Sequence, residues 1–458
     1  MKVMKFGGTS VADQPAIERL IALVRAERQA EAQTEGGDAR GPVVVVSALS
    51  GVTDRLLGVA ALAGSGDVEG ARTSLQDLRA RHIKVSEVIR DQALRGTVLE
   101  ALNHEFDELE RVVSALAVLQ EVSPRWMDAL AATGEILSSQ IVAAALTSHK
   151  LLATYVDARK AVVTDGEHMT AAPKFEETTA ALMAHADPPL AAGRIPVLGG
   201  FVGATTAGVT TTLGRGGSDF SAAIIGACLG AGEIQIWTDV DGMLTADPRI
   251  VKNPQVVPHL SFAEASELAY FGAKVLHPKT IKPAVDSGIP VRVCNTFEPD
   301  KVGTMVLGES GEAPNKIKSI AHKKNITILR ITSARMLGSY GFMSAVFQVF
   351  ERYRTVIDVI STSEVSIALT LDNTAEIDKI VAELRRLGDV EAEPGYAVIC
   401  VVGEGLRAST GLASKIFSTI DDVNIALVSH GASAVNLTFV VREEVVADVI
   451  KKLHGEFF

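Results

Sequence analysis

The chain has 458 residues, of which 47% are hydrophobic and 22% charged, and its formal net charge at pH 7 is −11. This length predicts two or three domains with ordinary globular cores. The acidic charge disfavours nucleic acid or an anionic membrane as a partner, and we expect neither. No apolar run reaches the roughly 20 residues that span a bilayer, and the N-terminus lacks the apolar core of a signal peptide, so we expect a cytoplasmic protein. The three cysteines lie far apart without metal-ligand spacing, so no protein-built metal site is expected.

Over the first two thirds of the chain, short apolar runs alternate with segments of helical periodicity. Strands are expected at 3–6, 43–46, 195–198 and 234–237. Helices are expected at 16–30, 133–147, within 68–119, and from a capping box at Ser261 through Leu268. This alternation predicts an α/β fold, with an open, mainly parallel sheet and helices on both faces. Ligands of such sheets bind in the loops at the carboxyl ends of the strands.

An internal repeat follows a polar break at 308–314. At an offset of 70 residues, Gly341 falls on Gly411 and Phe347 on Phe417, without a gap. Each copy has the order strand, helix, strand, strand, helix, which is typical of a split βαβ module. We therefore expect a catalytic domain at 1–308 and repeat domains at 315–390 and 391–458. Modules this small bury limited cores, so pairing with a neighbouring copy is expected.

The first candidate loop follows the first strand and contains Lys5, Gly7, Gly8 and Ser10. Glycines let backbone amides approach an anion, a following helix adds its positive end, and lysine supplies a mobile charge for phosphate oxygens. An ordinary strand-to-helix turn with a surface lysine explains the same residues.

Two further loops combine hydroxyls, glycines and charge. Ser47 and Thr53 follow the four-valine strand and could bind a carboxylate or phosphate, or equally cap a helix. In the loop 212–219, Arg215 lies among glycines, where its guanidinium could bind a carboxylate bidentately. Helix capping would explain Ser218 and Asp219 but not the arginine and glycines, so a ligand site is favoured there.

A fourth loop runs from Trp237 to Gly242 and leads to Arg249. It could hold the base and ribose of a nucleotide with Arg249 near the phosphates, although Asp-Gly turns are frequent. The chain contains neither GxxxxGK[ST] nor GxGxxG, which counts against P-loop NTPases and NAD enzymes. The residues alone predict an α/β enzyme that binds phosphate and carboxylate, and they leave its substrate open.

Motifs KFGGTS (5–10), TTLGRGGSD (211–219), WTDV (237–240) and FGAKVLHP (271–278) resemble the blocks of aspartate kinases, in the same order. The resemblance covers essentially the whole chain. It implies an amino-acid-kinase fold followed by two ACT domains, without a dehydrogenase domain. The implied activity is ATP-dependent phosphorylation of the L-aspartate side-chain carboxylate to 4-phospho-L-aspartate, the first step towards lysine, threonine and methionine.

The resemblance also implies roles for individual residues. Catalysis would involve Lys5, which neutralises the transferring phosphoryl group, and Asp219, which organises the centre. Aspartate would be held by Ser47, Thr53, Glu135, Arg215 and Ser218. ATP, with Mg²⁺ bridging its phosphates, would be held by Lys5, Gly7, Gly8, Ser10, Thr238, Asp239, Arg249 and Lys274. Leu244 replaces an aromatic residue of some members, which leaves stacking on adenine open.

The first repeat copy carries Asp358 inside an apolar strand expected at 356–360, where the second copy has Val428. A carboxylate in such a strand is costly unless paired, so a bound cationic amine is one interpretation. The other is that Asp358 is solvated at an edge or paired to a surface lysine. The effector pocket of lysine-inhibited aspartate kinases resembles the set Met336, Ser339, Phe342, Met343, Asp358, Thr362 and Ser363. By this resemblance we expect L-lysine as effector and a homodimer or higher oligomer through the ACT domains.

The chemistry needs no general base, because a carboxylate is already an anion near neutral pH. The protein must align two anions and neutralise the charge on the phosphoryl oxygens. Two alternatives remain: a catalytically inactive amino-acid sensor, and a kinase for glutamate, carbamate or a nucleotide. Charged residues in every loop argue against the first, and the doubled C-terminal module argues against the second.

Overall fold

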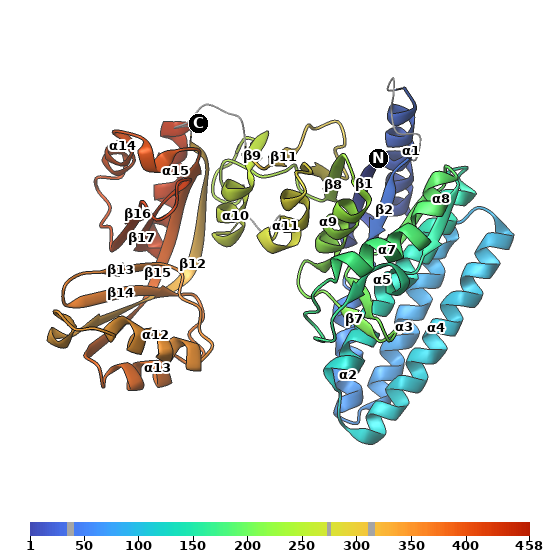
Figure 1. Cartoon of the computed structure of the whole chain (residues 1–458), viewed down its shortest axis with the longest axis horizontal. Coiled ribbons are helices and arrows are strands. Elements are labelled where there is room, and N and C mark those ends of the chain that lie inside the picture. The colour runs from blue at the N-terminus through green and yellow to red at the C-terminus, as the bar shows by residue number, and fades with distance from the viewer. Residues whose placement is uncertain (34–40, 273–275, 310–316) are drawn as a thin grey trace. The chain divides into compact units, whose positions relative to one another are not determined.

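The computed structural model describes residues 1–33, 41–272, 276–309 and 317–458. These residues form two compact units, shown in Figure 1. Unit 1 comprises Met1–Gly242 and Leu276–Gly308, and unit 2 comprises Met243–Val275 and Glu309–Phe458. The unit boundary after Gly308 lies near the expected break, whereas the stretch 243–275, which the sequence placed in a domain 1–308, belongs to unit 2.

The main sheet of unit 1 has the strand order β3-β5-β2-β1-β8-β10-β11. Its strands are β1 (Lys2–Phe6), β2 (Val43–Val46), β3 (Ala153–Val156), β5 (Ile195–Gly199), β8 (Glu233–Thr238), β10 (Val291–Asn295) and β11 (Thr304–Leu307). Neighbouring strands are parallel, except that β11 is antiparallel to β10. The valines of β2 are fully buried, because a central parallel strand is covered on both faces. A mainly parallel sheet is thus confirmed.

Helices flank this sheet, and a small second sheet has the order β4-β6-β7. The helices are α1 (Gln14–Gln33), α2 (Val52–Gly64), α3 (Val68–Val85), α4 (Gln92–Leu119), α5 (Pro124–Ser148), α6 (Ala158–Ala161), α7 (Phe175–His185), α8 (Asp187–Ala191), α9 (Gly217–Leu229) and α11 (Pro278–Asp286). The small strands are β4 (Val163–Thr164), β6 (Val202–Thr205) and β7 (Thr210–Thr212). The helical pattern at 68–119 divides into α3 and α4, because the side chain of Asp91 accepts hydrogen bonds from Ala93 and Leu94 and begins α4.

Helix α5 runs beside α3 and α4 in Figure 1 and belongs to the core of unit 1. Among the described residues it is the helix long and apolar enough to cross a membrane by length and composition, yet 89% of that stretch is buried inside the protein. Its apolar character is therefore explained by packing. Because α5 is buried almost all round, the polar side chains on it need partners within the protein or within a bound ligand.

Unit 2 contains an antiparallel sheet with the order β13-β14-β12-β15-β17-β16. Its strands are β12 (Ile317–Thr332), β13 (Ile360–Thr362), β14 (Ser366–Leu371), β15 (Asp389–Gly403), β16 (Leu427–His430) and β17 (Asn436–Arg442). Its helices are α12 (Phe342–Arg352), α13 (Ile377–Leu384), α14 (Leu412–Thr419) and α15 (Val446–Phe457). Gly341 and Gly411 begin α12 and α14 with φ values of +82° and +77°, so the repeat and its element order are present in the structure.

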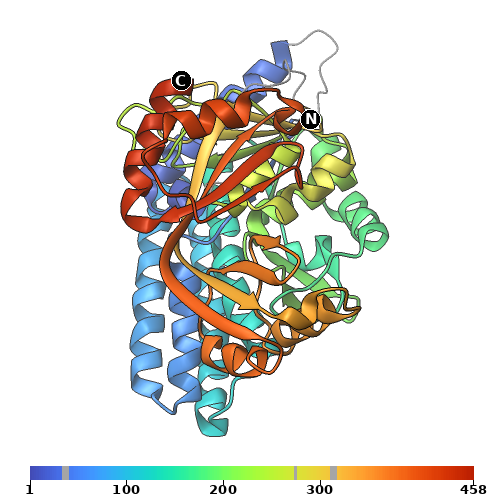
Figure 2. The same cartoon turned by 90° about the vertical axis from the view of Figure 1, so that its left-hand side faces the viewer.

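The long strands β12 and β15 each serve both repeat copies, and Figure 2 shows them curving through the sheet. The first part of β12, from Ile317, pairs with the end of β15 and packs against α14 and α15. Its second part, from Thr327, packs against α12 and α13. The boundary expected between 390 and 391 therefore does not separate self-contained modules, because each core uses a strand from the other copy.

The stretch 243–275 is an integral part of unit 2. It contains β9 (His259–Ser261) and α10 (Phe262–Tyr270), and the expected capping box is present: Ser261 and Glu264 exchange hydrogen bonds of 3.2 and 2.7 Å. Glu264 also forms a buried ion pair with Lys318 of β12 at 2.9 Å. Breaking such a buried pair would leave an uncompensated charge, so this contact ties α10 to the repeat sheet.

Candidate active site

A cavity of about 770 Å³ lies in unit 1 at the carboxyl ends of β1, β2 and β8. Most of the candidate residues of unit 1 line it together: Lys5, Gly7, Gly8, Ser47, Thr53, Glu135, Arg215, Ser218, Asp219, Thr238 and Asp239. They come from separate loops of the sequence. Their convergence follows from the parallel sheet, since the carboxyl ends of neighbouring parallel strands meet at one edge.

Lys5 and Asp219 form the charged pair of this cavity. The Nζ atom of Lys5 lies 2.6 Å from Oδ1 of Asp219, and the two side chains are 10% and 13% exposed. Lys5 is placed by β1, and Asp219 by the first turn of α9, whose N-terminus carries partial positive charge. The Lys5 ammonium and the positive N-terminus of α9 thus lie together, where a polyphosphate could be held.

Glu135 reaches the cavity from α5, which closely approaches the strand ends. A Cβ atom on Gly134 would lie 2.8 Å from Cβ of Ala48, and one on Gly199 would lie 3.0 Å from the Glu135 carbonyl oxygen. Burial raises the pKa of Glu135 to about 8, although a backbone hydrogen bond from Ala48 opposes the shift. Within the part of the chain that the structure describes, its buried Oε2 atom has no hydrogen-bond partner. A cationic ligand group would satisfy this oxygen.

Arg215 is the exposed cation of the loop between β7 and α9. Gly214 and Gly216 flank it with φ values of +76° and +73°, a backbone conformation that favours glycine. Its guanidinium forms no ion pair with the described residues. The planar fork therefore remains available for a carboxylate.

The side chains for which helix capping was an alternative do not occupy the N-caps of α2 and α9. Gly51 occupies the N-cap of α2, and Gly216 that of α9, both without a side-chain capping hydrogen bond. Thr53, Ser218 and Asp219 instead lie in the first turns of these helices and line the cavity. A ligand-binding explanation thus stands for these side chains.

Two of the three remaining residues expected at the ATP site, Ser10 and Arg249, do not line this cavity. The Ser10 side chain is buried, and its Oγ lies 2.7 Å from Oγ1 of Thr296. Arg249 belongs to unit 2, where it pairs with Asp247 at 2.6 Å and is 84% exposed. Lys274 lies outside the described residues. Their ATP-binding roles stay predictions, and the burial of Ser10 argues against phosphate contact by its hydroxyl.

Sequence analysis missed Met169 and Phe201, which also line the cavity. Phe201 follows β5 and a pair of glycines, so the strand-then-loop pattern could have found it. Met169 lies in an irregular segment and has a positive φ of 70°. Because no periodicity marks such a segment, the sequence carries no comparable signal for it.

The expected effector residues lie in the first repeat copy. Met336, Phe342 and Met343 pack on its core, whereas Ser339, Thr362 and Ser363 are exposed. The strand expected at 356–360 is wrong in extent, since β13 begins at Ile360. β13 is an edge strand, but Asp358 lies before it and is not part of it.

The Asp358 carboxylate itself is buried, with its side chain 1% exposed. Its Oδ1 accepts hydrogen bonds from the Lys323 ammonium at 3.0 Å and from the Tyr270 hydroxyl. The pairing with Lys323 agrees with the second interpretation of Asp358. The burial of the carboxylate rules out the other part of that interpretation, in which Asp358 is solvated at an edge. Oδ2 is buried and lacks a hydrogen-bond partner among the described residues, so one oxygen remains to accept another donor.

Comparisons with known proteins agree with this architecture. A profile of the Amino acid kinase family matches residues 1–295, and an ACT domain profile matches residues 399–457. The chain is 37% identical to Arabidopsis thaliana "Aspartokinase 1, chloroplastic", over 100% of this chain and 80% of that protein. It is 35% identical to Escherichia coli "Lysine-sensitive aspartokinase 3", over 100% and 99% of the two chains.

Solved structures of similar proteins agree at the level of the whole chain. The structure of E. coli aspartokinase III in complex with aspartate and ADP has a TM-score of 0.82 at 35% identity and covers 100% of both chains. The complex of the same enzyme with lysine and aspartate has a TM-score of 0.83 at 34% identity and covers 100% of this chain and 99% of that one. Because the family profile covers residues 1–295 and aspartokinases of 35% and 37% identity match the whole chain, the chain belongs to the amino acid kinase family and, within it, to the aspartokinases.

Proposed function

We propose that this aspartate kinase transfers the γ-phosphoryl group of ATP to the side-chain carboxylate of L-aspartate in the cavity of unit 1, giving 4-phospho-L-aspartate and ADP. The observation that carries this proposal is that an acidic and a basic side chain line the same cavity, each with an atom left to bind a ligand. Among the residues that the structure describes, no hydrogen-bond partner reaches the buried Oε2 of Glu135, and no ion pair engages the guanidinium of Arg215. An amino acid carries both complementary charges, so it would satisfy both residues at once.

The α-carboxylate of aspartate would bind the fork of Arg215, and its α-ammonium would bind Glu135. Hydroxyls of Ser47, Thr53 and Ser218, which share the cavity, would complete the polar contacts. These contacts would hold the side-chain carboxylate as the nucleophile. Orientation of two reactants in one pocket is a large part of what such an enzyme must provide.

In the transfer, a carboxylate oxygen forms a bond to the γ-phosphorus as the bond to the bridging oxygen of ADP breaks. Negative charge spreads over the phosphoryl oxygens, and Lys5 would neutralise it. The backbone amide of Gly8 would hold phosphate, whereas that of Gly7 already donates to the Trp237 carbonyl at 3.0 Å. Thr238 and Asp239 would contact the nucleoside. The carboxylate of Asp219 lines the cavity and fits Mg²⁺, which prefers oxygen ligands and would add positive charge at the phosphates.

A coupled assay of ADP release tests this proposal. The parent protein is mixed with ATP, Mg²⁺ and, in separate reactions, aspartate, glutamate, carbamate or UMP. Rapid ADP release is expected in the reaction with aspartate and not in the reactions with the other three acceptors. Release with another acceptor would reassign the substrate, and no release with any acceptor would support an inactive sensor instead.

We also propose L-lysine as an inhibitor that binds near Asp358, in a homodimeric or larger assembly joined through the ACT region, in the cytoplasm. Support comes from the name of the lysine-sensitive relative and from the buried carboxylate. The amine of a bound lysine would compete with Lys323 for Asp358 or use the unpaired Oδ2. Binding would inhibit only if lysine prefers an inactive arrangement of the protein.

Titration with lysine, threonine and methionine at fixed aspartate tests the regulatory proposal. Inhibition by lysine is expected at concentrations where threonine and methionine have little effect. If threonine inhibits the enzyme and lysine does not, the effector assignment is wrong and the kinase assignment is unaffected.

A further inference from the structure

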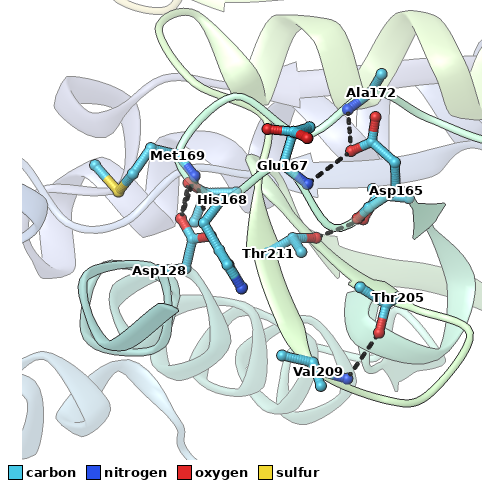
Figure 3. A network of polar contacts seen from close by, with 11 residues as sticks. Asp128, Asp165, Glu167, His168, Met169, Ala172, Thr205, Val209 and Thr211 are labelled. Atoms are coloured by element: carbon cyan, nitrogen blue, oxygen red, sulfur yellow. Dashed lines mark hydrogen bonds and ion pairs between the residues drawn. The ribbon is translucent and has the colours of Figure 1, made fainter. Parts of the chain in front are cut away.

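A buried carboxylate, Asp128 of α5, joins three segments beside the cavity, as Figure 3 shows in part. Its Oδ2 lies 2.6 Å from Nδ1 of His168, and both its oxygens lie 3.1 Å from the backbone nitrogen of Met169. The hydroxyl of Thr212 donates to Oδ1. The Asp128 side chain is fully buried, so these donors offset a desolvation cost that would otherwise be large.

The position of Asp128 relates it to the proposed aspartate-binding residues. Asp128 and Glu135 are seven residues apart on α5, about two helical turns, so they lie on nearly the same face of that helix. Thr212 ends β7, directly before the loop that carries Arg215. Asp128 does not line the cavity itself. Asp128 therefore connects α5, which carries Glu135, to the loop that carries Arg215, from a position outside the cavity lining.

The segment around Met169 provides the second link. Met169 lines the cavity with a φ of +70°, a conformation that costs free energy for a residue other than glycine. Its carbonyl oxygen would lie 3.0 Å from a Cβ on Gly214, so the Arg215 loop rests against it. The backbone nitrogen of Ala171 also donates to the Thr212 carbonyl at 3.0 Å. Hydrogen bonds to Asp128 hold this strained turn in place.

We propose that Asp128 is a positioning residue for aspartate binding: it holds Met169 and Thr212 against α5 and so sets the distance between Arg215 and Glu135. The proposal rests on the proposed roles of those two residues. A misplaced guanidinium would bind the α-carboxylate poorly even though every ligand-contacting side chain remained. Within the described part of the chain, the hydrogen bonds of Asp128 go to His168, Met169 and Thr212 and not to the nucleotide loops after β1 and β8, so ATP binding should be spared.

Asp128→Asn tests the proposal, because it keeps the volume and one acceptor oxygen but replaces the other oxygen with a donor. The aspartate KM is expected to rise on the order of tenfold, with the ATP KM changed less than about twofold. The matched control is Asp165→Asn. Asp165 lies in the same segment and accepts from the backbone nitrogens of Glu167 at 3.2 Å and Ala172 at 3.0 Å (Figure 3). The control should leave both KM values within about twofold of the parent.

Thermal midpoints of both variants separate positioning from stability. Equal rises in aspartate KM for both variants, or a lowered midpoint for Asp128→Asn with an unchanged aspartate KM, would overturn the proposal. Thr212→Val, which removes only one donor, should raise the aspartate KM by a smaller factor and serves if Asp128→Asn does not fold. An unchanged aspartate KM in a folded Thr212→Val would then count against the proposal. The parent is assayed first, so a failure to phosphorylate aspartate would contradict the proposed function instead.

Discussion

The Nζ atom of Lys5 lies 2.6 Å from Oδ1 of Asp219, across an interface between the end of β1 and the start of α9. Both groups are largely shielded from water and both line the cavity. The carboxylate holds the lysine side chain in one place before any phosphate arrives. A charge that is already oriented needs little reorganisation when the transition state forms.

Lys5→Ala should therefore lower kcat by on the order of 10²–10³, the effect of removing one preorganised charge. Asp219 would lose its cation, so the thermal midpoint should fall modestly as well. Steady-state kinetics and thermal unfolding measure the two effects. Lys2→Ala is the control, because Lys2 lies on β1, as Lys5 does, and pairs with Glu27 of α1 at 2.7 Å. It should leave kcat nearly unchanged, and a near-normal kcat in Lys5→Ala would refute the role of Lys5.

Arg215→Lys should raise the KM for aspartate far more than the KM for ATP. Lysine keeps the charge but loses the planar fork, which matters for a bidentate carboxylate contact. Initial rates at varied aspartate and at varied ATP separate the two constants. A rise confined to the ATP KM would place Arg215 at the nucleotide instead.

The Glu135 carboxyl should make the stability of the free enzyme depend on pH. Burial raises its pKa to about 8, above the ordinary value of 4.5. Between these values the unfolded chain releases a proton that the folded protein retains, so this group lowers the free energy of unfolding as pH rises towards 8. Glu135→Gln removes the titration. The thermal midpoint of the variant minus that of the parent should increase as pH rises from 5 to 8. A difference that stays constant over this range would contradict the raised pKa of Glu135.

Aspartate binding should show the opposite dependence on pH. The ammonium of a bound aspartate favours the ionised form of Glu135, so binding would release a proton from a carboxyl that is otherwise neutral below about pH 8. The affinity for aspartate should rise as pH increases from 7 towards 8. Isothermal titration calorimetry in buffers of different ionisation enthalpy measures the released proton. Release of the same proton by Glu135→Gln would assign it to another group.

Asp358→Ala should relieve lysine inhibition and leave the uninhibited kcat nearly unchanged. Lys323→Met removes the internal cation that bonds Asp358 at 3.0 Å, so it should lower the lysine concentration needed for half inhibition. Lys324→Met, at the exposed neighbouring position, is the control and should leave that concentration unchanged. Equal inhibition of the parent and Asp358→Ala would show that Asp358 is not a ligand of lysine. Weaker inhibition of Lys323→Met would contradict competition between the two amines.

Much of the active site was predictable because its signals are local. Glycines with a lysine after β1, or with Arg215 before α9, are short motifs, and the strand-end rule assigns such loops to one edge of the sheet. The repeat was equally local, since Gly341 and Gly411 mark helix starts at a fixed offset. Family membership followed from the motifs taken together.

By itself the sequence determined the mainly parallel fold, the loops that line the cavity and the doubled C-terminal module, because each depends on residues close together in the chain. The tertiary structure decided which distant groups meet. It paired Asp358 with Lys323, buried Ser10 against Thr296 and joined Asp128 to Met169. It also made β12 and β15 common to both repeat copies and placed 243–275 with them. Such partners are selected by packing and by the cost of leaving buried polar groups unpaired, and neither is encoded in a short stretch of sequence.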